Sequence, residues 1–154
     1  MKLRRQVVLP APFAAVADAL QRPALMRAAT APLMQLRSAE PGGYPDRWPG
    51  GVHRVTLHLF GILPLGPQII DVSWPAAPPG EARLRDNGRG PLIKRWDHAI
   101  TVRDNGDGTS TYIDELDFGA GLLTPLVWLS AKALFIHRQR RLLALAKQGL
   151  HTLH

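Results

Sequence analysis

Two residues of this chain, His98 and Asp114, have the types and the spacing of a proton-transfer pair. In a strand over residues 93–103, alternation places His98 on the same face as Trp96, Ile100 and Val102. Within the run 109–118, the face of Asp114 also holds Tyr112, Leu116 and Phe118. If the two runs pair with like faces together, His98 lies opposite Asp114 or one pair away, with Cβ atoms about 5 Å apart. A carboxylate fixes the tautomer of a histidine, so the couple could act as general acid and base. A structural hydrogen bond, or a place in water at the sheet edge, is the alternative.

Arg138 is a third polar candidate, because it lies on the apolar side of a predicted helix. Thr124 as N-cap and Pro125 at the first helical position begin a helix of about twenty-five residues, which ends at Gly149. At about 100° per residue, one side of this helix collects Val127, Trp128, Ala131, Leu134, Phe135, Leu142, Leu145 and Ala146. The angle of Arg138 falls inside this arc. Either its stem packs while the guanidinium snorkels to the helix edge or pairs with a strand carboxylate, or the guanidinium points into a cavity and meets a polar ligand group.

The other candidate site residues are mostly apolar. The catalytic candidates are His98 and Asp114, and the ligand-binding candidates are Trp96, His98, Ile100, Tyr112, Asp114, Leu116, Trp128, Phe135 and Arg138. Aromatic residues suit a core or a cavity wall, which is where we expect Trp48, Trp74, Trp96 and Trp128. We expect no metal, because His53 and His58 are five residues apart and therefore on opposite faces of a strand. We expect no cofactor, since the chain lacks a Gly-rich phosphate loop.

The candidates depend on a series of strands followed by one long helix. The predicted strands are residues 3–9, 33–38, 52–60, 67–74, 81–86, 93–103 and 109–118, and two short helices cover 12–20 and a piece that begins at Pro23. Residues 104–108, Asp-Asn-Gly-Asp-Gly, are typical of a hairpin between the last two strands. We therefore expect an α+β fold, in which an antiparallel sheet of six or seven strands packs on the C-terminal helix and two short helices follow the first strand.

Length and cysteine content narrow the class of protein. The 154 residues predict a single domain over 1–154, with a sizeable core. The absence of cysteine is typical of a reducing compartment, so we expect a cytoplasmic protein. No apolar run reaches the roughly 20 residues of a spanning helix. Residues 1–17 imitate a signal peptide, but Pro10 and Pro12 interrupt the apolar region, and we expect a strand and a helix there instead.

The net charge of +7 is concentrated in the C-terminal helix. Residues 122–154 contain five Lys or Arg residues and no Asp or Glu. Such a helix face is usually solvated, although it can attract anionic lipid or nucleic acid. No nucleic-acid-binding motif accompanies it, so we expect no nucleic-acid partner. Weak contact with an anionic membrane stays open, as does the oligomeric state.

Four segments carry a resemblance to a known family. They are the strand, proline and helix of residues 7–16, Trp96-Asp97-His98, the segment 114–118 (Asp-Glu-Leu-Asp-Phe), and the segment 137–141 (His-Arg-Gln-Arg-Arg). With the order of elements, they make the chain resemble the START-like helix-grip (SRPBCC) superfamily. Its members include polyketide cyclase/dehydrase-like proteins, lipid-transfer domains, pollen-allergen-type proteins and coenzyme Q-binding proteins. The resemblance implies a curved antiparallel sheet that grips the C-terminal helix, with a hydrophobic cavity between them.

The expected function is binding of a small or medium hydrophobic ligand with a polar handle in that cavity, without catalysis. One alternative is a cyclase/dehydratase-type enzyme, in which His98 and Asp114 transfer protons on a polyketide-like or other carbonyl substrate. Another alternative is a peripheral-membrane lipid or quinone binder that uses the basic helix face and the apolar loop 60–65. The fold alone does not choose among them, because one fold serves many ligands.

Overall fold

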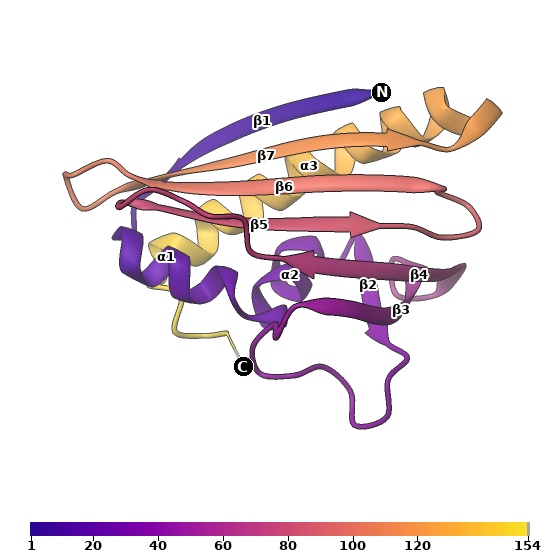
Figure 1. Cartoon of the computed structure of the whole chain (residues 1–154), viewed down its shortest axis with the longest axis horizontal. Coiled ribbons are helices and arrows are strands. Elements are labelled where there is room, and N and C mark those ends of the chain that lie inside the picture. The colour runs from indigo at the N-terminus through magenta and orange to yellow at the C-terminus, as the bar shows by residue number, and fades with distance from the viewer. Residues whose placement is uncertain (154) are drawn as a thin grey trace.

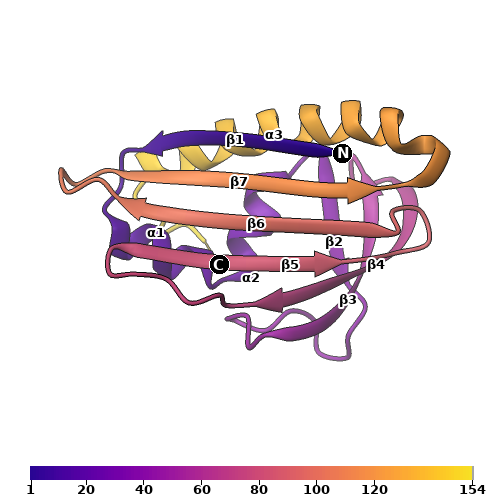
Figure 2. The same cartoon turned by 45° about the horizontal axis from the view of Figure 1, so that its top comes forward.

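A seven-stranded antiparallel sheet and a long C-terminal helix make up most of the computed structural model, which describes residues 1–153. The strands are β1 (Lys2–Leu9), β2 (Met34–Ser38), β3 (Gly51–Leu59), β4 (Leu63–Ser73), β5 (Glu81–Gly88), β6 (Arg95–Asp104) and β7 (Ser110–Gly119). The helices are α1 (Phe13–Leu20), α2 (Pro23–Thr30), the 3-10 turn η1 (Gly121–Leu123) and α3 (Thr124–Lys147). The strand order is β1-β7-β6-β5-β4-β3-β2, and the sheet curves around one side of α3 (Figure 1 and Figure 2). The predicted α+β class, strand number and terminal helix are confirmed.

Two local predictions are wrong. β4 begins at Leu63, four residues early, because the chain reverses in a tight turn in which the Ile62 amide donates to the Leu59 carbonyl at 3.1 Å. Thr124 is not an extended N-cap: it already has helical angles, because η1 runs directly into α3. Its hydroxyl donates to the Gly121 carbonyl at 2.6 Å and accepts from the Ala120 amide at 3.0 Å, so it closes the 3-10 turn instead.

The two faces of the sheet differ in chemistry. Facing α1, α2 and α3, the strands contribute apolar side chains to a core that α3 completes with Leu142, Leu145 and Ala146. The opposite face carries exposed ion pairs between neighbouring strands, such as Arg85 with Asp97 at 2.8 Å. Alternation along each strand therefore separates an inner apolar face from an outer charged one, as the sequence predicts.

Among residues 1–153, no helix is long and apolar enough to cross a lipid bilayer. His137 lies outside the apolar arc predicted for α3. It is nevertheless half-buried, and its Nε2 lies 2.8 Å from the Ala31 carbonyl at the end of α2. The helix α2 packs on α3 at this point, and a histidine side chain satisfies a carbonyl that the end of α2 leaves free.

Candidate functional site

The predicted pair of His98 and Asp114 is formed, deep between the sheet and α3. Asp114 is opposite Ile100 in the β6–β7 register and His98 is opposite Leu116, so the pair is diagonal, one of the two registers expected. His98 Nε2 and Asp114 Oδ1 lie 2.9 Å apart, and both side chains are almost fully buried. Because an ionised carboxylate only accepts hydrogen bonds, Nε2 is the protonated ring nitrogen.

The second oxygen of Asp114 binds a residue of α3. Gln139 donates from Nε2 to Asp114 Oδ2 at 3.0 Å, and Gln139 is itself buried. Its position follows from helix geometry, since Gln139 lies four residues after Phe135 and three before Leu142 on the buried side. The carboxylate thus receives one hydrogen bond from the sheet and one from the helix, which ties the two layers together.

Arg138 is buried as well, with only 7% of its surface exposed. Its Nη2 donates to the Tyr112 hydroxyl at 2.7 Å and lies 3.8 Å from Asp114 Oδ1. The expectation that it snorkels to the helix edge is wrong, while pairing with a strand carboxylate and facing a cavity both occur. The Nε atom of Arg138 is buried and has no hydrogen-bond partner within residues 1–153. A buried guanidinium N–H without an acceptor costs free energy, so an acceptor that reached this atom would stabilise the folded protein.

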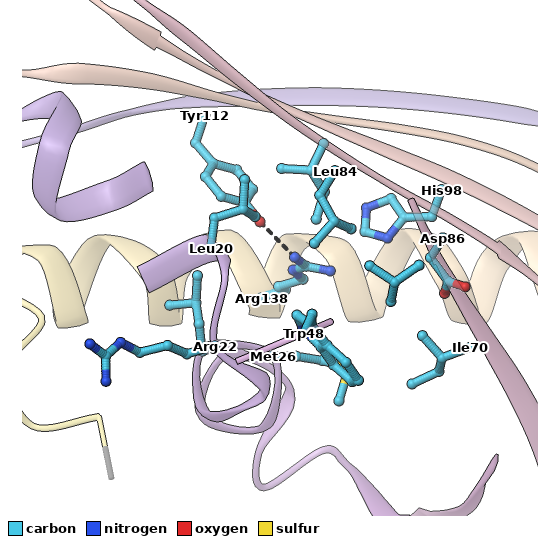
Figure 3. A pocket seen from close by; sticks show the side chains of 13 residues that line it. Leu20, Arg22, Met26, Trp48, Ile70, Leu84, Asp86, His98, Tyr112 and Arg138 are labelled. Atoms are coloured by element: carbon cyan, nitrogen blue, oxygen red, sulfur yellow. Dashed lines mark hydrogen bonds between the residues drawn. The ribbon is translucent and has the colours of Figure 1, made fainter. Parts of the chain in front are cut away.

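A cavity of about 50 Å³ adjoins these groups. Arg138 projects into its middle, His98 and Asp86 lie side by side on one wall, and Trp48 and Met26 lie across from them (Figure 3). Of the predicted ligand-binding residues, those on its wall are His98, Ile100, Tyr112 and Arg138. About 50 Å³ accommodates a few water molecules, whereas pockets for drug-sized ligands measure about 300–1,000 Å³.

The other predicted apolar residues form a neighbouring cluster instead of the cavity wall. This cluster contains Leu116, Trp96, Trp128 and Phe135. Phe135 joins it to the polar group, because its ring stands edge-on to His98 with centroids 5.0 Å apart. Trp48 is buried and lines the cavity, as expected. The expectation for Trp74 is wrong: it is 39% exposed, in the proline-rich connection that follows β4.

The sequence-based prediction missed two residues of the site, Asp86 and Gln139. Asp86 is opposite His98 in the β5–β6 register, so alternation from Leu84 would have placed it on the inner face. Its Oδ1 accepts a hydrogen bond from the Asp71 amide at 2.8 Å, and among residues 1–153 no cationic side chain bonds to it. Burial is the main cause that raises the pKa of Asp86 to about 7, with a smaller contribution from the negative charges of Asp71 and Asp97.

The other buried groups have pKa shifts of opposite kinds. Burial lowers the pKa of His98, and the hydrogen bond that His98 donates to Asp114 only partly offsets it, so the imidazole is neutral at neutral pH. Burial alone would raise the pKa of Asp114, but the Arg138 charge and the His98 hydrogen bond outweigh it and lower this pKa. The cluster therefore contains one fixed carboxylate, one fixed guanidinium and a neutral imidazole. The other imidazole nitrogen, Nδ1, has no hydrogen-bond partner within residues 1–153, and the ring lines the cavity.

Solved structures with the same architecture span almost the whole chain. A conserved protein from Geobacillus kaustophilus superposes with a TM-score of 0.66 at 16% identity, covering 96% of each chain. A START superfamily protein from Mycobacterium smegmatis gives 0.65 at 12% identity over 96% of this chain and 97% of that one. The ZhuI aromatase/cyclase from Streptomyces sp. R1128 gives 0.65 at 13% identity over 96% and 94%.

These likenesses, with the curved sheet around α3, define the class as a START-like helix-grip fold. At such identities they bear on the fold alone. The chain belongs to the family described as a domain of unknown function, DUF8410, whose model matches residues 7–145. No curated protein matches the sequence.

Proposed function

We propose that this protein binds a small hydrophobic molecule with an oxygen acceptor, a carbonyl or a carboxylate, in the space between the sheet and α3. The observation that carries the proposal is Arg138. Its guanidinium lies on the wall of an otherwise largely apolar cavity, and its buried Nε has no acceptor within residues 1–153. A ligand oxygen at this atom would satisfy it, and the apolar walls would contact the rest of the ligand.

The volume of about 50 Å³ means that a ligand of more than a few atoms must displace part of the wall. Met26 is the best candidate to move, because its unbranched side chain changes rotamer easily and it is only half-buried. Trp48 is held more firmly, since its buried ring packs edge-on with the rings of Tyr44 and His53. The proposed ligand therefore enters from the side of α1 and α2.

Native mass spectrometry of protein purified without detergent tests the proposal. We expect an adduct with the mass of a small organic molecule, which is lost or reduced in Arg138→Leu and retained in Arg140→Leu, a change on the exposed side of the same helix. Stranding the ligand oxygen should weaken affinity by about 1 to 3 kcal/mol. If Arg138→Leu does not fold, Ile70→Phe reduces the cavity with an apolar side chain and should also displace the adduct. An adduct that survives both changes would mean that binding occurs elsewhere.

A second candidate function, proton-transfer catalysis on a bound carbonyl compound, is favoured by the state of His98. With Nε2 donating to Asp114, the Nδ1 lone pair is free to accept a proton in the cavity. His98→Ala should then abolish turnover of a polyketide-like or other carbonyl substrate, by about 10² to 10⁴-fold, and leave its binding nearly intact. If His98→Ala changes affinity alone, the protein is a binder.

A further inference from the structure

Large apolar side chains gather on the surface at one end of the molecule. Of the twelve exposed large apolar residues within 1–153, eight lie in three segments there: the β3–β4 turn, the β5–β6 loop, and η1 with the start of α3. Both views place these three segments at the same end, on the right (Figure 1 and Figure 2). We call this surface the apolar tip, and it consists of Phe60, Ile62, Leu63, Leu92, Leu122, Leu123, Leu126 and Leu129.

The fold does not need these side chains. Leu122 is 100% exposed and Ile62 is 83% exposed, so neither contributes to a core. Phe60 is 60% exposed and has a φ of 52°, a left-handed backbone conformation that a bulky residue rarely adopts. Glycine or asparagine would fill that turn position at lower cost. An aromatic ring in solvent at a strained position points to contact with something outside the chain.

The charges near the apolar tip are positive. Lys94 follows Leu92, Lys132 follows Leu129 by one turn, and neither pairs with a carboxylate among the described residues. Arg37, on β2, reaches the β3–β4 turn, where its Nη2 donates to the Gly61 carbonyl at 2.6 Å. The carboxylates of Asp97 and Asp117, on the strands that lead to this end, are already bound by arginines. The tip thus combines protruding apolar side chains with uncompensated positive charge.

We propose that the apolar tip docks onto the surface of a bilayer that contains anionic phospholipid. The apolar side chains enter the boundary between headgroups and acyl chains, while Lys94, Lys132 and Arg37 contact the phosphates. Charge complementarity favours this occupant over a second copy of the chain, which would bring like charges together. The docking surface differs from the basic helix face expected from the sequence, because Arg140 and Lys147 lie toward the other end of α3. This inference does not depend on the cavity or its ligand.

Co-sedimentation of the full chain with lipid vesicles tests the docking. At low salt, we expect binding to vesicles of equal parts phosphatidylcholine and phosphatidylglycerol, weak binding to phosphatidylcholine alone, and loss of binding at high salt. Phe60→Asn should weaken the partition coefficient by about fivefold to tenfold, because it removes one inserted side chain. Val8 is also exposed, but it lies near the end of β1 that is far from the apolar tip (Figure 1). Val8→Asn should therefore leave the partition coefficient unchanged.

The charges are tested with matched pairs of lysine and arginine changes. Lys94→Gln with Lys132→Gln should weaken binding about tenfold or more, since each charge near such a surface contributes about 1 kcal/mol. Arg140→Gln with Lys147→Gln removes the same charge from the other end of α3 and should have little effect. An equal loss in both pairs would overturn the proposal, because attraction would then follow net charge and not the tip.

Labelling gives a readout specific to position, because the chain contains no cysteine. A polarity-sensitive fluorophore on Leu122→Cys should shift to the blue when the mixed vesicles are added, and the same fluorophore on Val8→Cys should not. Absence of vesicle binding by the parent protein overturns the inference. So does a dimer in light scattering that Phe60→Asn dissociates, because the tip would then be covered by a second copy.

Discussion

In its second half, α3 buries Arg138 and Gln139, whereas in its first half the same helix leaves Leu126 and Leu129 more than half exposed. A helix that only covered a core would exchange these two sets, with leucines inside and polar groups in water. Burying an arginine and exposing leucines both make the fold less stable than the reverse arrangement would be. Proteins accept such losses mainly at functional sites. The buried polar residues lie beside the proposed ligand, and the exposed leucines lie in the proposed docking surface.

The largest effect is expected from the carboxylate that compensates the buried half. Asp114→Asn leaves Arg138 buried without a negative partner, and it replaces one acceptor oxygen by a donor. We expect the free energy of unfolding, measured in urea, to fall by about 3 to 5 kcal/mol. Asp97→Asn is the matched control, because its exposed pair with Arg85 is expected to contribute less than about 1 kcal/mol. Similar losses in both variants would mean that the buried cluster is no more important than a surface pair.

Substitution of one leucine in each half of α3 compares the two halves directly. Leu142→Ala should lower the free energy of unfolding by about 2 to 5 kcal/mol, because Leu142 is 1% exposed in the main core and its removal leaves a cavity. Leu126→Ala should change it by no more than about 0.5 kcal/mol. The same urea titration measures both. A large loss in Leu126→Ala would show that the apolar tip packs against the fold, which would contradict its exposure.

A third effect concerns pH. Asp86 has a pKa near 7 in the folded protein against an ordinary value near 4, so the folded state binds the extra proton between these values. Its contribution to stability therefore decreases as pH rises from about 4 to about 7, and is constant above. Asp86→Asn keeps an oxygen for the Asp71 amide and removes the titration. We expect the variant to exceed the parent in stability by on the order of 2 kcal/mol at pH 8 and by little at pH 4.

Asp97 is a control for that experiment, because its contribution to stability depends on pH in the opposite direction. The hydrogen bond from Arg85 is the main cause that lowers the pKa of Asp97, so its contribution is present at neutral pH and is lost as pH falls below about 4. Asp97→Asn should thus differ from the parent at pH 7 and converge with it in acid. If Asp86→Asn instead behaves like Asp97→Asn, being less stable than the parent at neutral pH and converging with it in acid, Asp86 is ionised in the folded protein and the cavity carries an additional negative charge.

The sequence was sufficient to predict the features that depend on local patterns. Alternation along β6 and β7 predicted that His98 and Asp114 share the inner face, and the hairpin limited their register to two choices. The phase of α3 predicted that Arg138 faces inward, although it did not decide between snorkelling and burial. That choice depends on Tyr112 and Asp114, which are about 25 residues earlier and are brought under the helix only by the tertiary fold.

The parts that were missed are those that depend on packing between distant segments. Alternation puts Asp86 on the same face as Leu84, but the strand is short, and the pairing of β5 with β6 establishes that this face is the inner one. The small volume of the cavity depends on how Met26 and Trp48, from α2 and the segment before β3, fill the space above the sheet. The apolar tip was only partly foreseen, through the loop 60–65. Its other members lie in the β5–β6 loop and in η1 with the start of α3, and these segments meet that turn only at one end of the folded molecule.

The smallest effect separates the strain of the tip from its proposed role. Phe60→Asn should raise the free energy of unfolding by about 0.5 to 1 kcal/mol, because asparagine tolerates the left-handed conformation at φ 52° and the ring that it replaces is mostly in solvent. Phe60→Ala removes the ring but lacks the short polar side chain with which asparagine hydrogen-bonds locally in this conformation, so it should bring no such gain. Thermal unfolding of both variants beside the parent measures the difference. If Phe60→Asn is less stable than the parent, the ring packs on the turn and the exposed aromatic needs no external partner. If it is the more stable and also binds vesicles less, the chain retains Phe60 at a cost in stability for contact beyond its own fold.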